Sequence, residues 1–142
     1  MDYSKDGLHL TEQFEGCRLA AYRDQGGVLT IGYGHTGPDV NAALVITQEQ
    51  AENLLRRDVA SACSNVNRLV KVPLKQYEFD ALVDFVFNCG FGNFLHSTLL
   101  RKLNANDFQG AASEFERWDK CGSKEVAGLL RRRQAEKSEF SS

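Results

Sequence analysis

The spacing of apolar side chains changes along the chain and predicts one strand-like region within a largely helical protein. Leu8, Leu10 and Phe14 close a helical pattern, for which Gly16 is a natural C-terminal stop. A short strand-like run, the turn-like segment 24–27 and a second run rich in β-formers, 28–33, come next. Apolar residues at helical spacing then predict helices at about 48–66, 75–89, 97–103, 107–118 and 124–140.

The predicted helix at 48–66 follows the strand-like region and is long enough to connect two lobes. Thr47 and Gln50 have the spacing of a capping box, with Thr47 as the N-cap. Pro73 breaks the pattern that follows.

Apolar residues occupy nearly all faces of the predicted helix at 75–89, which is typical of a helix buried in the middle of a lobe. Gly90 and Gly92 are expected to end it.

Length and composition place the chain among ordinary soluble globular domains, with 142 residues, 42% of them apolar and 25% charged. No apolar run approaches the roughly 20 residues that span a bilayer, so no stable membrane insertion is expected. The formal net charge is −2: residues 1–70 carry 6 basic and 9 acidic side chains, and residues 71–142 carry 11 and 10. A broad basic face for nucleic acid is therefore not expected.

The cysteines and histidines do not have the spacing of a metal site. Cys17, Cys63, Cys89 and Cys121 form no Cys-x-x-Cys motif, and the three histidines are scattered. Two disulfides would allow three pairings, but without an export signal free thiols are the favoured interpretation. Cys17 lies two residues after Glu15, so a disulfide there could distort the surroundings of that carboxyl.

Two carboxyl groups in the first part of the chain have different predicted surroundings. Glu15 sits at a helix C-terminus beside Phe14, where the helix dipole and partial desolvation favour its protonated form. Asp24 lies in a turn open to water and would remain ionised, and the hydroxyl of Thr30 could hold a water molecule. One protonated and one charged carboxyl is the arrangement of glycoside hydrolysis. For an arbitrary pair, a surface Glu and a turn-forming Asp are the commoner explanation.

The spacing of these three residues, together with the run Thr-Ile-Gly-Tyr-Gly-His-Thr at 30–36, resembles the catalytic segment of the phage-type lysozymes, the endolysins of glycoside hydrolase family 24. Eight residues separate Glu15 from Asp24 and five separate Asp24 from Thr30, as in the family's catalytic triad. Similarity extends from about residue 8 to about residue 136 and includes the stretches 87–90, 97–100, 117–118 and 128–133.

This resemblance implies a lysozyme-like α+β fold in a single domain, 1–142. A small lobe with a β-hairpin or three-stranded sheet, about 1–46, would be joined by a helix, about 47–68, to an all-α lobe, about 69–142. The substrate would bind between the lobes.

The implied reaction is hydrolysis of the β-1,4 bond between N-acetylmuramic acid and N-acetylglucosamine in peptidoglycan. Glu15 would protonate the leaving oxygen, Asp24 would stabilise positive charge and orient the attacking water, and Thr30 would hold that water. Family precedent implies inversion at the anomeric carbon, and the resemblance implies no metal or organic cofactor.

Two alternatives remain open at this point. A lytic transglycosylase cuts the same bond with one Glu, which the presence of Asp24 and Thr30 disfavours. A non-catalytic peptidoglycan-binding protein could keep the fold without the activity, which the intact triad disfavours.

The resemblance also implies where and with what the protein acts. We expect a monomer that binds peptidoglycan strands and depends on a holin-like membrane protein. It would stay in the host cytoplasm until release to the periplasm, since no signal or anchor segment is visible, unless an export segment was removed.

Several residues in the second half allow two interpretations each. Asn88 is either a substrate contact or a satisfied helix-end amide, and Ser97 is a substrate contact or, more simply, a helix N-cap. Trp118 is expected in the core, and His35 is expected to make a structural hydrogen bond. The cluster Arg131, Arg132 and Arg133 predicts a solvated face with one structural ion pair, and family analogy permits a pairing with an acid near the catalytic site.

Overall fold

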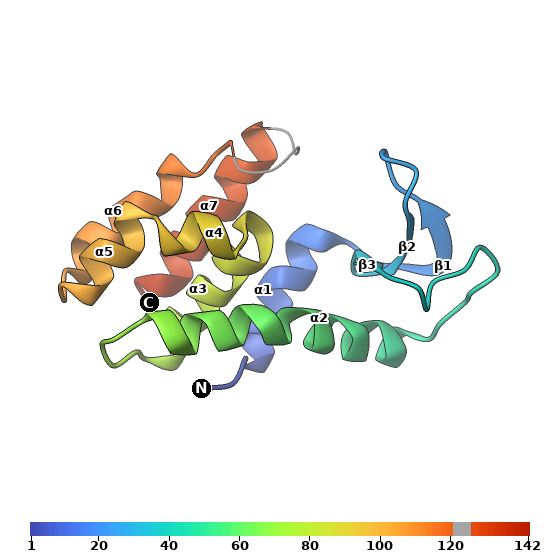
Figure 1. Ribbon diagram of the computed structural model, residues 1–142, viewed down its shortest axis with the longest axis horizontal. Coiled ribbons are helices and arrows are strands. Elements are labelled where there is room, and N and C mark those ends of the chain that lie inside the picture. The colour runs from blue at the N-terminus through green and yellow to red at the C-terminus, as the bar shows by residue number, and fades with distance from the viewer. Residues whose placement is uncertain (121–125) are drawn as a thin grey trace. The chain divides into compact units, whose positions relative to one another are not determined.

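The chain begins with a helix, continues into a small antiparallel sheet and ends in a series of helices (Figure 1). The computed structural model describes residues 1–120 and 126–142. They fall into two units: Thr11–Ala60, here called the sheet unit, and Met1–Leu10 with Ser61–Ser142, here called the helical unit. Helices combined with a small antiparallel sheet confirm the predicted α+β class.

The three strands of the sheet unit lie in the order in which they occur along the chain. Strands β1 (Arg18–Arg23), β2 (Leu29–Gly32) and β3 (His35–Thr36) are antiparallel neighbours. Thr30 on the middle strand lies opposite Tyr22 on β1 and Thr36 on β3. The sheet therefore places Thr30 at its centre, and the turn between β1 and β2 forms the tip of the hairpin (Figure 1).

Two helices contribute residues to both units. Helix α1 (Lys5–Glu15) ends where predicted, because Gly16 adopts a φ of +67° that favours glycine. Helix α2 (Gln48–Leu69) begins with the predicted capping box. The backbone N–H of Gln50 donates to the hydroxyl of Thr47 at 3.1 Å, and the N–H of Thr47 donates to the Gln50 side chain at 2.8 Å.

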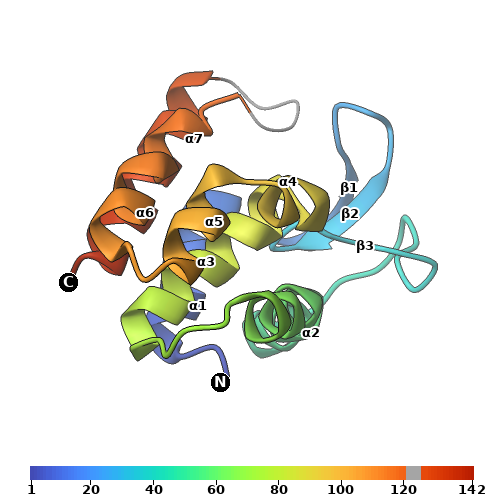
Figure 2. The ribbon, with the colours of Figure 1, turned by 60° about the vertical axis from the view of Figure 1, so that its left-hand side comes forward.

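The helical unit is built around α3. Besides parts of α1 and α2, this unit contains α3 (Gln76–Cys89), α4 (Phe91–Leu95), α5 (Thr98–Asn104), α6 (Phe108–Glu114), the short 3-10 helix η1 (Phe115–Arg117) and α7 (Val126–Phe140). Helix α3 packs against α7, and α5 packs against α6 (Figure 2). The ring of Phe85 on α3 meets Phe94, Phe115 and Trp118 edge-on, with centroids 5.6 to 6.1 Å apart. This cluster confirms that α3 is the buried helix, and it includes Trp118, which is half-buried at the edge of the core.

The structure differs from the sequence prediction after α3. Gly90 ends that helix with a φ of +95°, as expected, but a short helix, α4, begins immediately afterwards and contains Gly92. Burial of Phe94 explains this helix, because its side chain is fully enclosed and packs on Phe85. The predicted helix at 107–118 is likewise divided into α6 and η1.

Residues close to the N-terminus are fixed to α3 within the helical unit. The backbone N–H of Ser4 donates to Oδ1 of Asp80 at 3.2 Å, and the Ser4 hydroxyl donates to Oδ2. Gln76 adds a third hydrogen bond, from Nε2 to Oδ1 at 2.9 Å. The buried carboxylate of Asp80 therefore has three donors, as a buried charge requires. None of the described helices is both long and apolar enough to cross a membrane.

Candidate active site

The carboxyl group of Glu15 lies against the backbone of the turn between β2 and β3. An ideal Cβ atom built on Gly34 in this turn would be 3.3 Å from Oε1 of Glu15. Gly34 also has a φ of +85°, which favours glycine. Glycine at this position therefore leaves the room that the half-buried carboxyl of Glu15 occupies.

The side chain of Tyr33, next to Gly34, is held by hydrogen bonds to the side chains of Gln48 and Glu12. The hydroxyl of Tyr33 accepts a 2.7 Å hydrogen bond from Nε2 of Gln48 on α2, and it is also hydrogen-bonded to Glu12 on α1. Burial, reinforced by Glu12 and opposed by Gln48, raises the pKa of Tyr33 to about 12. Tyr33 therefore stays protonated near neutral pH and can hold the turn in place.

Asp24 shapes the turn between β1 and β2 with its own side chain. Its Oδ1 accepts hydrogen bonds from the N–H groups of Gly26 and Val28, both at 2.9 Å. Its backbone N–H donates to the carbonyl of Val28 at 3.0 Å, and its carbonyl accepts from Gly27 at 2.9 Å. The carboxylate is exposed, so one oxygen is oriented by the backbone while the group as a whole faces water.

Thr30 is buried, with 3% of its surface exposed, and its hydroxyl has a defined orientation. Oγ1 donates to the carbonyl of Val28 at 2.9 Å. Because a hydroxyl has one hydrogen and two lone pairs, this bond leaves Thr30 to act as an acceptor towards any further group. Val28 thus holds both side chains, Asp24 through its N–H and Thr30 through its carbonyl.

His35 makes the structural hydrogen bonds that the sequence predicted for it. Its Nδ1 lies 2.8 Å from Asp58 on α2, and its Nε2 lies 3.0 Å from Asp39. Burial alone would lower the pKa of His35, but the two carboxylates outweigh that effect and raise it. The same contact lowers the pKa of Asp39.

Comparison with known proteins agrees with these motifs. The profile of the family described as "Phage lysozyme" matches residues 12–136. The chain belongs to the phage lysozyme family.

Two relatives show how far the similarity extends. The chain is 47% identical over 146 residues to the endolysin of Acyrthosiphon pisum secondary endosymbiont phage 1, with 100% of this chain and 99% of the relative covered. It is 46% identical over 142 residues to the endolysin of Bacillus phage B103, with 99% of this chain and 54% of that relative covered. The chain thus spans about half the length of the second relative.

A solved structure agrees over nearly the whole chain. The endolysin from Escherichia coli O157:H7 phage FAHEc1 superposes with a TM-score of 0.92 at 38% identity, covering 99% of this chain and 93% of that chain. The predicted family, the lysozyme-like fold and the assignment as a cell-wall glycoside hydrolase are therefore confirmed. The two alternative functions are not favoured.

The structure divides the five predicted site residues between the two units of this lysozyme. Glu15, Asp24 and Thr30 belong to the sheet unit, and Asn88 and Ser97 belong to the helical unit. Asn88 accepts a 2.8 Å hydrogen bond from Arg133 through Oδ1.

Ser97 is the N-cap of α5. Its side chain accepts from the N–H of Leu100 at 3.0 Å and donates to the carbonyl of Phe94 at 2.7 Å. It is 4% exposed, so its position fits the N-cap interpretation. Contact of Asn88 or Ser97 with substrate stays a prediction.

The arginine cluster differs from the expected solvated face with one ion pair. Arg132 binds Asp84 through two hydrogen bonds, at 2.8 and 2.9 Å, and both side chains are buried. Arg133 pairs with Glu136 at 2.7 Å, and neither is exposed to solvent. Two arginines therefore bind buried carboxyl groups and only Arg131 of the three lies on the surface, because the last helix packs these side chains against α3.

The prediction of free thiols is confirmed for two cysteines and wrong for a third. Cys17 and Cys63 are free, and burial raises the pKa of both thiols, so neither is activated as a nucleophile. Cys89 is disulfide-bonded, and Arg133 donates to its sulfur. The prediction was based on the missing export signal, which carries no information on the geometry around α3. Cys121 lies outside the described residues.

Sequence reasoning did not find Tyr33 and Val28 as parts of the site, and it indicated Gly34 only as one of five glycines that suggest a tight backbone or close approach of a ligand. Gly34 stands in the quoted Gly-Tyr-Gly-His run, so its identity was a usable signal for close approach to another group. Val28 acts only through backbone atoms, which leave no trace in the identity of a side chain.

Proposed function

We propose that this lysozyme hydrolyses the β-1,4 bond between N-acetylmuramic acid and N-acetylglucosamine with Glu15, Asp24 and Thr30 as its catalytic residues. The observation that carries this proposal is the shared support of Asp24 and Thr30 by Val28, on the same small sheet whose next turn faces Glu15. A carboxyl for the leaving group and a carboxylate with a hydroxyl for the water are the parts that the reaction needs.

Glu15 would donate its proton to the leaving glycosidic oxygen. Its position at the last residue of α1, against a turn that Tyr33 anchors, limits how far the carboxyl can move. Proton transfer demands a well-defined carboxyl position, because a general acid must lie within hydrogen-bond reach of the atom that it protonates.

Asp24 and Thr30 would orient the attacking water together. Since the Thr30 hydrogen is donated to Val28, both side chains present acceptor oxygens, and each can take one hydrogen of the same water. The lone pair of that water would then be directed away from both residues and towards the sugar. The ionised Asp24 would also stabilise the positive charge that develops on the ring.

Attack by water on the face opposite the leaving group would invert the anomeric carbon. Inverting enzymes hold their two carboxyl groups roughly 6.5–9.5 Å apart to leave room for the water. NMR of the first products tests this: the α-anomer should appear first and then equilibrate. An initial β-anomer would overturn the inverting mechanism.

Clearing of outer-membrane-permeabilised Gram-negative cells tests the role of Glu15. Wild type should clear the suspension, and Glu15→Gln should not, because the amide keeps the shape of the acid but has no acidic proton to give. Glu49→Gln is the matched control, since Glu49 lies exposed in the first turn of α2 and should keep full activity.

The masses of the products then distinguish hydrolysis from the lytic transglycosylase reaction. A hydrolase adds one water to each cleaved bond, whereas a lytic transglycosylase leaves a lighter anhydro-sugar, and mass spectrometry distinguishes them. Full activity of a folded Glu15→Gln variant would refute the proposed acid. A polysaccharide left unchanged by folded wild type would instead support a binding protein.

The same family assignment supports three proposals about the protein's setting. It acts as a monomer on peptidoglycan strands, it requires no cofactor, and it depends on a holin-like protein to reach the periplasm from the host cytoplasm. Expression with and without a co-expressed holin tests the last of these, because lysis should then require both proteins.

A further inference from the structure

The peptide group between Gly27 and Val28 is held at both of its ends. Nη1 of Arg23 donates to the carbonyl oxygen of Gly27 at 2.8 Å. The N–H of Val28 donates to Oδ1 of Asp24 at 2.9 Å. That carbonyl and that N–H belong to one planar peptide group. Arg23 and Asp24 therefore bind opposite edges of the same rigid group.

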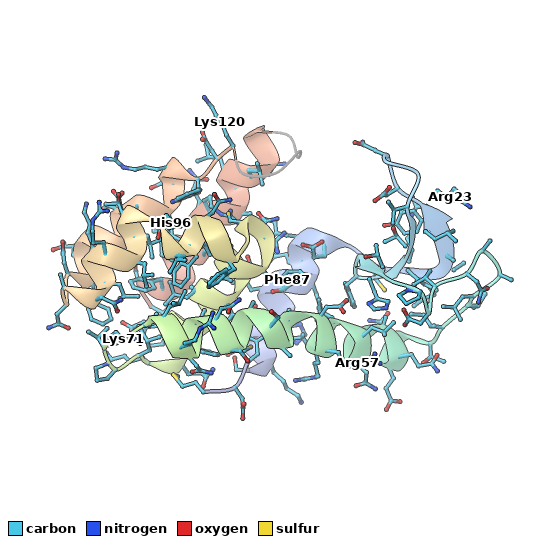
Figure 3. All side chains as sticks on the ribbon, in the orientation of Figure 1. Arg23, Arg57, Lys71, Phe87, His96 and Lys120 are labelled. Carbon is cyan, nitrogen blue, oxygen red and sulfur yellow. The ribbon has the colours of Figure 1, made fainter. Side chains whose placement is uncertain are left out.

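We propose that Arg23 is a positioning residue for Asp24, acting through this peptide plane. Arg23 lies at the end of β1, where Figure 3 labels it, and Asp24 follows it directly. Its guanidinium fixes the direction of the Val28 N–H, which fixes Oδ1 and so the plane of the carboxylate. The inference rests on the proposed role of Asp24 in catalysis.

The turn needs such a support because its own backbone is permissive. Gly26 and Gly27 are adjacent, and Gly27 has a φ of +80°. A peptide plane that follows two glycines can rotate, and in an exposed turn water competes for its hydrogen bonds. A guanidinium at the carbonyl end also polarises the peptide, which strengthens the N–H donor at the other end.

Loss of Arg23 should act locally, because other bonds close the hairpin. The N–H of Asp24 donates to the carbonyl of Val28 at 3.0 Å, and the N–H of Gly27 donates to the carbonyl of Asp24 at 2.9 Å. Neither bond involves the Arg23 side chain, so the strands should stay paired while the 27–28 peptide rotates more freely. The effect would fall on turnover rather than on folding.

The experiment compares Arg23→Gln with Arg18→Gln on a soluble peptidoglycan glycan fragment. Both arginines are exposed on β1, so each variant loses one positive charge from the same strand. The Arg18 guanidinium instead stacks over the Tyr22 ring, 4.5 Å from its centroid. We expect kcat of Arg23→Gln to fall about 3- to 10-fold with KM within about 2-fold, and Arg18→Gln to stay within about 2-fold in both.

Two further readouts distinguish positioning from general damage. Arg23→Lys should recover part of the lost kcat, since an ammonium group can also donate to the Gly27 carbonyl. The Val28 amide should exchange its hydrogen about 10-fold faster in Arg23→Gln than in wild type, while amides of α2 should be unchanged.

The proposal would be overturned by equal losses in Arg23→Gln and Arg18→Gln, or by a rise in KM with unchanged kcat, because either result indicates an effect of charge on polymer binding. Asp24→Asn separates this inference from the proposed function. If Asp24→Asn is inactive and Arg23→Gln matches wild type, only the role of Arg23 fails. If Asp24→Asn is fully active, the proposed role of Asp24 fails.

Discussion

Nδ1 of His35 lies 2.8 Å from a carboxylate oxygen of Asp58, and this ion pair joins β3 to α2 within the sheet unit. Asp39 binds the other ring nitrogen at 3.0 Å, so the imidazole is enclosed by two carboxylates. Their attraction outweighs the effect of burial and raises the pKa of His35 above its ordinary value. The protonated ring is therefore the form that the folded sheet unit prefers.

The contribution of His35 to stability should depend on pH. A raised folded pKa means that the contribution is fully present below the unfolded value of about 6.5 and is lost as pH rises through the folded value. We expect the difference in Tm between wild type and Asp58→Asn to be largest near pH 6, at about 3 °C or more, and to shrink towards pH 9. A difference that stays constant over this range would show that charge is not involved.

Gly34→Ala should reduce activity more than its effect on stability explains. The new methyl group would be 3.3 Å from Oε1 of Glu15 and would displace the carboxyl. Gly90→Ala is the control, because Gly90 also has a positive φ but a Cβ there meets nothing within 4 Å. Each variant should lose about 1–2 kcal/mol of stability from backbone strain, and only Gly34→Ala should lose about 10-fold or more in kcat. Similar kcat values in the two variants would contradict this expectation.

Thr30 should be replaceable by serine but not by valine. Serine keeps the hydroxyl that donates to the Val28 carbonyl, whereas valine keeps the shape and loses the oxygen. We expect Thr30→Val to lose about 10- to 100-fold in kcat and Thr30→Ser to lose much less, measured on the same soluble glycan fragment. Equal losses in both variants would point to packing rather than to a water-holding hydroxyl.

Glu136 should make the wild-type protein less stable as pH rises. Burial and the neighbouring Asp84 raise the pKa of Glu136 well above its ordinary value, although Arg132 and Arg133 oppose them. Stability from such a group is fully present below the unfolded pKa and is lost as pH rises from the unfolded to the folded pKa, by about 1.4 kcal/mol per pH unit between the two values.

Denaturant unfolding between pH 5 and 9 measures this effect. The stability of Glu136→Gln relative to wild type should improve as pH rises, since the amide does not titrate. Glu116→Gln provides the contrast, because Lys137 lowers the pKa of Glu116 and the loss should then appear at acidic pH. A pH-independent difference between Glu136→Gln and wild type would refute the prediction.

Local signals in the sequence predicted those parts of the fold that neighbouring residues determine. The capping box of Thr47 and Gln50 starts α2, and Gly16 ends α1, because each depends on atoms within one helical turn. The short helix α4 escaped prediction, since its five residues are too few to show a helical period and the burial of Phe94 is decided by α3.

Long-range pairing could not be predicted in the same way. Arg132 and Asp84 are 48 positions apart, and three adjacent arginines give no sign of which one is buried. The spacing of Glu15, Asp24 and Thr30 identified the candidate catalytic residues, and their roles stay a prediction. The peptide plane that supports Asp24 depends on backbone atoms, so no pattern of side chains could have revealed it.

The hydrogen bonds between Ser4 and Asp80 have a consequence for how the protein is made. The two residues are 76 positions apart in the chain, yet both belong to the helical unit. At synthesis rates of 5–20 residues per second, Ser4 waits roughly 4 to 15 seconds for Asp80 to be added. The sheet unit is contiguous and ends at Ala60, so its last residue is added before Asp80, and we expect translation to order the assembly of the enzyme.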